Sequence, residues 1–362
     1  MSTSPPSRPR PPRTRQSREE RQRELRRRRR RAGAALAIAT VALIAIVYSA
    51  FAGGGSVKPS PETNGQSEEA PEHRSPPRTF GAGVATFHFV DTSRTVLVEG
   101  QDEPRTLETV VYYPTNGGPS NEPVSEATPA AMGGPFPLIV FGHGFEKTPQ
   151  TYQPLLEYWA RHGYVVAAPV FPLENKDAPG GPNESDLPNE PQDISFVITS
   201  MIEEAQRGTG AFTHVIDTQH IGVSGHSDGG DAALAAAFDP ALRDSRISAA
   251  AILSGAEIPM LGPFTFPSSG PALLAVQGTA DHLNKPPETY AYYAQAPRPK
   301  YLLKLIGARH LPPYTIPGSQ LETVRKVTLQ FFDAYLKGDQ KALQELQSSE
   351  NLGSPATLTA EP

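Results

Sequence analysis

The chain has 362 residues, of which 38% are hydrophobic and 20% charged, and its formal net charge is −5. This composition indicates one globular domain with a sizeable core, together with appended segments. The chain contains no cysteine, which excludes disulfides, thiolate zinc sites, a cysteine nucleophile and a lipid-acylated cysteine.

The positive charge is concentrated at the amino terminus. Residues 1–31 contain 13 arginines against 3 glutamates, and residues 26–31 are six consecutive arginines. Taken alone, such a block would suggest binding to nucleic acid. We predict no nucleic-acid partner, because a long apolar segment follows directly. Residues 1–31 are instead expected to be a basic, disordered segment on the cytoplasmic side of a membrane.

The apolar segment is residues 32–52, which contain 21 consecutive residues without a charge. At helical rise this length spans about 31 Å, the hydrocarbon core of a bilayer. The arginines precede it and Tyr48 and Phe51 lie at its far end, which predicts a single-pass transmembrane anchor with a cytoplasmic amino terminus. The alternative is a signal peptide cleaved near residues 50–52, which would give a secreted protein. Both interpretations place the remaining chain outside the cytoplasm.

The folded domain is expected at residues 79–347, after a flexible linker at 53–78 and before a disordered tail at 348–362. Strands are predicted at 86–90, 95–98, 107–113, 137–141, 164–170, 220–224, 249–253, 272–277 and 301–306. Helices are predicted at 152–162, 193–207, 229–238 and 320–336. Several of the strands are short, continuous apolar runs, which are typical of fully buried parallel strands. The alternation predicts an α/β fold with a mostly parallel central sheet and helices on both faces.

The most specific motif lies in residues 220–230, where G-x-S-x-G stands between a predicted strand and an alanine-rich helix. Strand, sharp turn and helix in this order are what a nucleophile elbow requires, so Ser227 is the predicted nucleophile. Gly225 and Gly229 fit the strained turn and the close approach of strand and helix. Because G-x-S-x-G alone is a weak signal, the flanking strand and helix carry the prediction.

A serine nucleophile needs a base, and the base needs a carboxylate that orients it. Asp281 and His310 each follow a predicted buried strand through a short turn, at the edge where open α/β sheets place their ligands. His282 is the main rival as base, but adjacent residues do not readily supply both acid and base to one serine. His226 is expected to point away from Ser227. The predicted catalytic residues are therefore Ser227, Asp281 and His310.

Four motifs in order carry a resemblance to a known family: F-G-H-G-F at 141–145, G-H-S-D-G-G at 225–230, G-T-A-D at 278–281, and His310. Over about residues 80–340 the chain resembles the α/β-hydrolase superfamily. It is most similar to the branch of dienelactone-hydrolase-like proteins, chlorophyllases and platelet-activating-factor acetylhydrolases. The resemblance implies the α/β-hydrolase fold. Since cysteine is absent, the cysteine nucleophile of a true dienelactone hydrolase is ruled out.

The resemblance also implies an oxyanion hole beside the nucleophile. The backbone N–H groups of Phe145, in a His-Gly-x loop, and of Asp228, directly after the nucleophile, are the expected donors. His143 is expected to brace the turn rather than to react. The acidic side chain of Asp228 departs from the apolar or aromatic residues common at this position in lipases.

These features predict a serine hydrolase that cleaves carboxylic esters through an acyl-enzyme intermediate, outside the cytoplasm. The expected substrate is a small-molecule or lipid ester, with no cofactor and no metal, and the loop at 172–191 is expected to shape the pocket. Two alternatives stay open. One is a peptidase or amidase on the same triad, and the other is a catalytically silent binding domain displayed at the cell surface.

Overall fold

The computed structural model describes residues 79–118, 122–263, 265–348 and 356–362. The predicted basic segment (1–31), anchor (32–52) and linker (53–78) lie outside these residues. Within the described ranges, no helix combines the length and the apolar character that crossing a bilayer requires.

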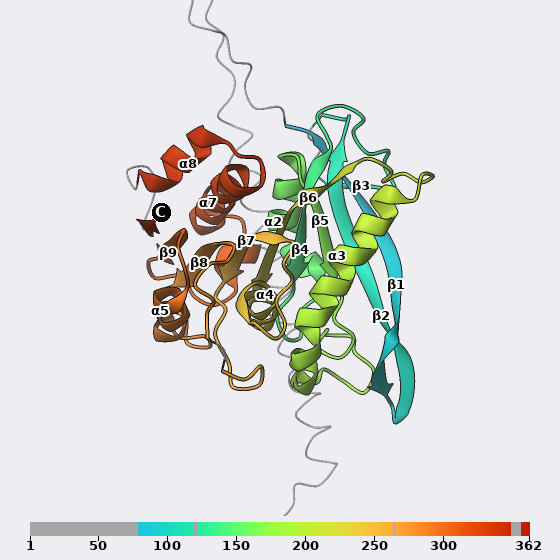
Figure 1. Cartoon of the computed structure of the whole chain (residues 1–362), viewed down its shortest axis with the longest axis horizontal. Helices are drawn as coiled ribbons and strands as arrows, with labels where there is room; N and C mark the ends of the chain where they lie inside the picture. Colours follow the sequence, from blue (N-terminus) through green and yellow to red (C-terminus); the bar gives the residue numbers. More distant parts are fainter. Residues whose placement is uncertain (1–78, 119–121, 264, 349–355) are drawn as a thin grey trace, which may run out of the picture. The chain divides into compact units, whose positions relative to one another are not determined.

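The described strands form one sheet in the order β10-β9-β8-β7-β6-β4-β5-β2-β1-β3 (Figure 1). Their bounds are β1 (Gly81–Val98), β2 (Gln101–Thr115), β3 (Val124–Ser125), β4 (Phe136–Gly142), β5 (Val165–Pro169), β6 (Ile216–His226), β7 (Ile247–Leu253), β8 (Ala272–Gly278), β9 (Lys300–Leu305) and β10 (Ala356–Glu361). The pairs from β5 through β4, β6, β7 and β8 to β9 are all parallel. Antiparallel pairs join β1 to β2, β2 to β5 and β9 to β10. The prediction of a mostly parallel sheet is confirmed.

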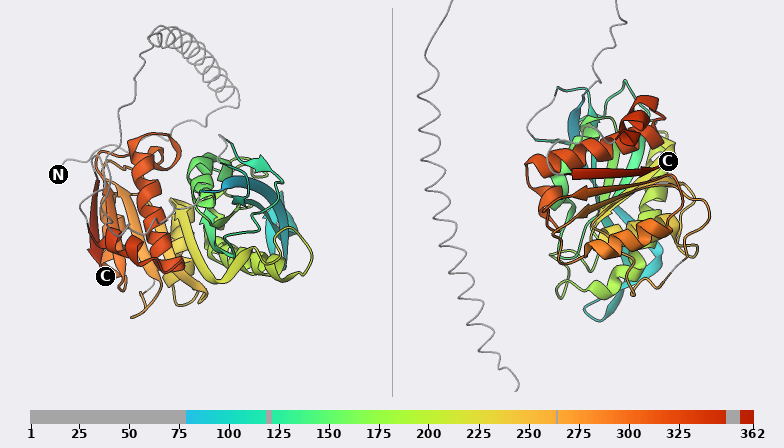
Figure 2. Two further views of the ribbon diagram at one scale, coloured as in Figure 1. Left: turned by 90° about the horizontal axis from the view of Figure 1, so that it is seen from above. Right: turned by 90° about the vertical axis from the view of Figure 1, so that its left-hand side faces the viewer.

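Helices cover both faces of this sheet (Figures 1 and 2). One face packs against α3 (Glu190–Gln206), α4 (Asp228–Phe238) and α5 (Pro286–Gln295). The other face packs against α2 (Gln153–Arg161), α6 (Pro312–Thr315), α7 (Ser319–Leu336) and α8 (Gln340–Gln347). Two short 3-10 helices, η1 (Pro149–Tyr152) and η2 (Glu184–Asn189), precede α2 and α3. The predicted three-layer arrangement is therefore confirmed.

The central strands are buried along their length because helices cover them on both sides. Every residue of β4, with the sequence FPLIVFG, is buried, as is every residue of β5 and β8. Helix α4 is also buried throughout, and its alanines allow it to lie close to β6 and β7. The junction of β6 and α4 is thus held from all sides, which suits a turn that carries a reacting group.

The first predicted strand pair differs from the structure. The segments predicted at 86–90 and 95–98 belong to one long strand, β1, whose register against β2 shifts between Asp91 and Thr95. At this irregularity Asp91 accepts hydrogen bonds from the N–H of Ser93 (2.9 Å) and from Arg94 Nε (2.6 Å). The polar side chains that suggest a loop in the sequence instead satisfy a bulge within the strand.

The carboxyl-terminal prediction is wrong in part. Residues 348–362 are expected to form a disordered tail, yet β10 pairs antiparallel with β9 from Ala356 opposite Leu305 to Glu361 opposite Lys300. Leu358 is buried while its neighbours in the strand are more exposed. In Figure 2 (right) β10 lies at the sheet edge beside β9. Pairing with the edge of β9 stabilises this strand, and the local sequence does not predict that tertiary contact.

Candidate active site

The turn between β6 and α4 has the geometry of a nucleophile elbow. Ser227 lies there with φ 55° and ψ −128°, a strained conformation for a residue other than glycine. The surrounding backbone is packed so closely that side chains do not fit. A Cβ on Gly225 would lie 2.0 Å from the carbonyl oxygen of Gly229, and a Cβ on Gly229 would lie 2.3 Å from the backbone of Gly142. The glycines therefore let β4, β6 and α4 meet at Ser227.

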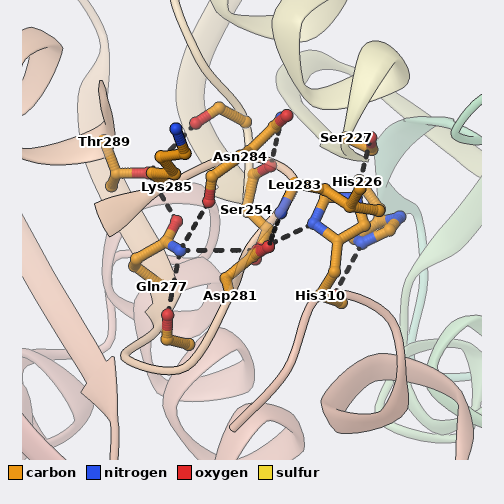
Figure 3. A network of polar contacts seen from close by, with 12 residues as sticks. His226, Ser227, Ser254, Gln277, Asp281, Leu283, Asn284, Lys285, Thr289 and His310 are labelled. Atoms are coloured by element: carbon orange, nitrogen blue, oxygen red, sulfur yellow. Dashed lines mark hydrogen bonds and ion pairs between the residues drawn. The ribbon is translucent and has the colours of Figure 1, made fainter. Parts of the chain in front are cut away.

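Ser227, His310 and Asp281 lie in hydrogen-bond sequence (Figure 3). His310 Nε2 is 2.9 Å from Ser227 Oγ, and His310 Nδ1 is 2.7 Å from Asp281 Oδ2. The three side chains follow β6, β9 and β8, so they come from neighbouring parts of the sheet's carboxyl edge. His282, the rival base, is exposed, and it is His310 that contacts the serine hydroxyl.

The turns that carry the acid and the imidazole are bound to each other. The N–H of Ala280 donates to the carbonyl of Ala308 (2.9 Å), and the N–H of Gly307 donates to Thr279 Oγ1 (2.8 Å). A Cβ on Gly278 would lie 2.5 Å from the carbonyl oxygen of Ala308, so glycine is needed for this approach. The separation between acid and base is thus fixed by backbone contacts.

Asp281 is 3% exposed and well supplied with donors. Besides His310, the N–H of Leu283 donates to its Oδ1 (2.9 Å) and the Gln277 side chain to its Oδ2 (3.4 Å). Burial alone would raise the pKa of Asp281, but the hydrogen bond and charge of His310 and the Leu283 N–H outweigh it and hold the pKa below 3.8. The group is therefore a carboxylate at neutral pH, able to orient the imidazole and to stabilise its protonated form.

The loop after β4 packs directly against the nucleophile. A Cβ on Gly144 would lie 3.0 Å from the Cβ of Ser227. The N–H groups of Glu146 and Lys147 donate to backbone carbonyls, whereas none of the described residues accepts the N–H of Phe145. A free donor beside the nucleophile is what an oxyanion hole needs, and Phe145 is one of the two predicted donors.

Asp228 supplies the other predicted donor. It is the first residue of α4, and the first N–H groups of a helix have no acceptor within the helix. The positive end of the helix dipole lies at the same point, next to Ser227. The structure therefore places both predicted N–H groups on segments that border Ser227, while their role in binding an oxyanion stays a prediction.

His143 braces the loop after β4. Its Nδ1–H donates to the carbonyl of Gly144 (3.0 Å), and its Nε2 accepts the N–H of Phe171 (3.0 Å), which follows β5. Burial lowers the pKa of His143 to about 4, so the ring is neutral and can donate at one nitrogen and accept at the other. The prediction that His143 braces the turn is confirmed.

Comparison with known protein families gives one decisive finding. The family model described as Chlorophyllase matches residues 93–280, more than half of the chain. The chain belongs to the chlorophyllase family. It is therefore a carboxylic ester hydrolase, and the predicted resemblance to this branch of the α/β-hydrolases is confirmed. The match includes the loop after β4 and the nucleophile elbow, and it ends one residue before Asp281.

The fold of this chlorophyllase-family protein is also found among solved structures. A ferulic acid esterase from Streptomyces cinnamoneus is similar with a TM-score of 0.60 and 24% identity, over 81% of this chain and 98% of that chain. At this level of identity the likeness concerns the fold, which is that of the α/β-hydrolases. A search among curated proteins gave no match.

The pocket of this chlorophyllase-family protein lies over Ser227 and has a volume of about 500 Å³. Phe145, Leu283 and Leu311 supply apolar surface, and Glu184 and Asp228 supply carboxyl groups. Glu184 belongs to the loop at 172–191, which accords with the expectation that this loop shapes the pocket.

Arg105 of β2 anchors the end of that loop. Its guanidinium donates to Asp193 Oδ1 (2.6 Å) and to Asp186 Oδ2 (2.8 Å), and all three side chains are at most 5% exposed. Asp186 lies in η2 and Asp193 in the first turn of α3. The ion pairs therefore tie the part of the pocket wall that contains Glu184 to strand β2.

Behind the pocket lies a group of carboxyl side chains that the sequence analysis does not predict. Glu174 and Glu190 are both fully buried, and their carboxyl groups have no partner among the described residues other than each other. Burial raises the pKa of Glu174 to about 9, with the charge of Asp228 as the second cause. Burial also raises the pKa of Glu190, Asp228 and Asp231. These acids come from separate loops and helices, so no spacing in the sequence indicates that they meet.

In the part of the chain that the structure describes, no three His, Asp or Glu side chains are arranged to hold a metal ion.

Proposed function

We propose that this chlorophyllase-family hydrolase cleaves esters through an acyl-enzyme formed on Ser227. In the first half-reaction, Ser227 Oγ attacks the ester carbonyl carbon while His310 Nε2 takes the hydroxyl proton. The proton then passes from His310 to the departing alkoxide, and the C–O bond of the ester breaks. In the second half-reaction, His310 takes a proton from water while the water oxygen attacks the acyl carbon. The bond between the acyl carbon and Ser227 Oγ then breaks, His310 returns the proton to Ser227, and the carboxylic acid leaves.

The observation that carries this proposal is the hydrogen-bond sequence from Ser227 through His310 to Asp281, with distances of 2.9 and 2.7 Å. A charged Asp281 stabilises the imidazolium that forms when the serine proton moves. The N–H groups of Phe145 and Asp228 would stabilise the tetrahedral oxyanion, and each such donor is commonly worth about 3 to 4 kcal/mol.

The pocket favours an ester of moderate size. Its volume of about 500 Å³ suits a ligand with one ring or a short chain, and Phe145, Leu283 and Leu311 offer apolar contacts. The likeness to a ferulic acid esterase makes esters of aromatic acids the first group to compare with acetate, butyrate and longer aliphatic esters. We propose this moderate-sized ester as the substrate class.

We also propose that residues 32–52 tether the enzyme to a membrane, with the catalytic domain outside the cytoplasm. The support is the uncharged segment of 21 residues that directly follows the arginine-rich block. A protease added to intact cells should then remove the catalytic domain, and it should spare the domain if the chain is cytoplasmic.

A fluorophosphonate probe tests the catalytic proposal on the full-length protein. We expect covalent labelling at Ser227, complete loss of labelling in Ser227→Ala, and loss of at least a hundredfold in labelling rate in His310→Ala. A matched pair of p-nitrophenyl ester and p-nitroanilide substrates then separates an esterase from an amidase. Folded wild-type protein that neither labels nor hydrolyses any ester would overturn the proposal.

A further inference from the structure

A chain of hydrogen bonds runs behind the nucleophile through two side chains that the triad does not use. The N–H of Gly144 donates to the Tyr152 hydroxyl oxygen (3.2 Å), and that hydroxyl lies 2.8 Å from His226 Nδ1. His226 Nε2 in turn lies 2.9 Å from the backbone carbonyl oxygen of His310 (Figure 3 shows the last contact). The chain therefore starts on the oxyanion loop and ends on the turn that carries the catalytic imidazole.

The direction of each bond in this chain follows from the chemistry of its ends. A backbone carbonyl only accepts, so Nε2 of His226 must carry a proton. Burial, followed by the charge of His310, lowers the pKa of His226 to about 3, so the ring is neutral and Nδ1 has no proton. Nδ1 then accepts from the Tyr152 hydroxyl, whose oxygen accepts from the Gly144 N–H. Only one tautomer of His226 and one orientation of the Tyr152 hydroxyl satisfy all three contacts.

The backbone groups at both ends of this series of hydrogen bonds, the Gly144 N–H and the His310 carbonyl, depend on it for a partner. Within the described residues, the Tyr152 oxygen is the recorded acceptor for the Gly144 N–H, and His226 is the recorded donor to the His310 carbonyl. His310 follows β9 on a turn outside the regular elements, held on its other side by the contact between Ala280 and Ala308. Loss of the chain would leave one side of the imidazole-bearing turn without a polar contact.

The neutral state of His226 also matters for the reaction. The rings of His226 and His310 have their centroids 4.6 Å apart, so a second positive charge on His226 would oppose the imidazolium that His310 becomes. With Nδ1 occupied by the tyrosine hydroxyl, His226 has no free basic nitrogen to compete for the serine proton.

We propose that Tyr152 and His226 are positioning residues that lock the oxyanion loop, the elbow and the His310 turn into one reactive arrangement. The inference rests on the serine-esterase function proposed above. Neither side chain carries a reacting atom, although His226 also lines the pocket over Ser227. Their effect is on the distance and angle between groups that react, where an error of about 1 Å can cost about a hundredfold in rate.

The first test is Tyr152→Phe in the full-length enzyme, assayed with p-nitrophenyl acetate. The change removes only the hydroxyl, so both the Gly144 N–H and His226 Nδ1 lose their partner. We expect kcat to fall about 10- to 100-fold, KM to stay within about twofold, and the rate of fluorophosphonate labelling to fall by the same factor as kcat.

A matched control separates positioning from loss of stability. Tyr164 is also fully buried, and its hydroxyl donates to Asp333 (2.7 Å). It directly precedes β5, at the amino-terminal end of the strand and away from the carboxyl ends where the site lies. Tyr164→Phe removes the same group and should leave kcat within about twofold of wild type. If Tyr152→Phe has the kcat of this control, the proposal is wrong.

A second test compares two substitutions of His226, of which only one can restore its hydrogen bonds. Glutamine offers an amide NH2 as donor and a carbonyl oxygen as acceptor, whereas leucine offers neither. We expect His226→Gln to retain a kcat at least about tenfold above that of His226→Leu, with similar KM values. Equal kcat values for the two variants would overturn the role of the chain.

The tautomer of His226 can be read without any activity. In ¹⁵N spectra of histidine-labelled wild-type protein, the His226 signals, assigned by their loss in His226→Gln, should show a protonated Nε2 and a bare Nδ1 between pH 5 and 8. A protonated Nδ1 would contradict the chain. If the wild-type enzyme proves inactive on esters, the proposed function fails, while this spectrum still decides the hydrogen-bond chain.

Discussion

Buried carboxyl groups lie on two sides of Ser227, and they differ in charge although both are removed from water. Asp281 accepts hydrogen bonds from His310 and from the Leu283 N–H, and these hold its pKa below the usual value. Glu174 is buried at least as deeply, its only partner among the described residues is the buried carboxyl group of Glu190, and burial raises its pKa to about 9. The comparison shows that the supply of donors, more than depth, decides which acid is ionised at neutral pH.

This difference in charge between the two sides of Ser227 fits the proposed reaction. A negative charge is useful on the far side of the imidazole, where it stabilises the imidazolium. On the near side, next to the predicted oxyanion donors, a negative charge on Asp228 would oppose the oxyanion. The same replacement of a carboxyl by an amide should therefore cause a large loss of activity at Asp281 and little loss at Asp228.

The largest effect is expected for Asp281→Asn. The amide keeps the size of the side chain but cannot stabilise the protonated imidazole or fix its tautomer, so kcat should fall by about 10⁴-fold. Steady-state kinetics with p-nitrophenyl acetate measure the change. A decrease of less than tenfold would show that another group orients His310.

The next largest effect is expected on stability, at the two buried carboxylates, Asp186 and Asp193, that are paired with a cation. Arg105→Met would leave Asp186 and Asp193 buried without their partner, and the free energy of unfolding should drop by about 3 to 5 kcal/mol. Urea denaturation measures this. Arg207→Met, which breaks the pair between the exposed Arg207 and the partly buried Glu204, should change the stability by less than about 1 kcal/mol, and equal losses would refute the distinction.

Glu174→Gln tests the carboxyl without donors through its pH dependence. Burial raises the pKa of Glu174 from 4.5 to about 9, so the folded state holds a proton that the unfolded state releases. The associated stability is fully present below about pH 4.5 and is lost as the pH rises towards 9.

Glutamine carries no titrating proton, so Glu174→Gln should lose less stability than wild type between pH 5 and 9. Between pH 5 and pH 7 the difference should reach about 2 to 3 kcal/mol, at about 1.36 kcal/mol per pH unit. Thermal unfolding at several pH values measures it, with the exposed Glu203→Gln as the control. Parallel pH curves for wild type and Glu174→Gln would mean that Glu174 is ionised in the folded protein.

The smallest effect is expected for Asp228→Asn. Burial, and then the charge of Glu184, raises the pKa of Asp228, so a negative charge on this side chain is disfavoured. The amide keeps the size of the side chain without that charge, so kcat near pH 7 should stay within about threefold of wild type. A loss above about a hundredfold at pH 7 would mean that the carboxylate itself takes part.

The sequence predicts those parts of the site that depend on local chain geometry. The elbow can be recognised because its glycines, strand and helix are contiguous, and Asp281 and His310 each follow a strand that is mostly apolar. The mostly parallel sheet follows from the alternation of strands and helices. The family match and the fold then agree with the class of hydrolase that these motifs indicate.

What the sequence does not predict depends on contacts between distant segments. Tyr152 and His226 are 74 positions apart, and only the packing of η1 beside the elbow brings the hydroxyl to the imidazole. Glu174 and Glu190 look like ordinary surface acids, because nothing nearby in the chain shows that loops will bury them. Strand β10 is similar, since its pairing partner, not its own composition, makes it a strand.

That last pairing has a consequence for handling the protein. Residues 356–361 cover the outer hydrogen-bonding edge of the apolar strand KYLLKL, and Glu361 also contacts Tyr293 and Arg298. Trimming these residues, by proteolysis or by design, would present a bare row of N–H and C=O groups to other molecules. Shortened preparations should therefore tend to self-associate, and an affinity tag is better kept away from this end.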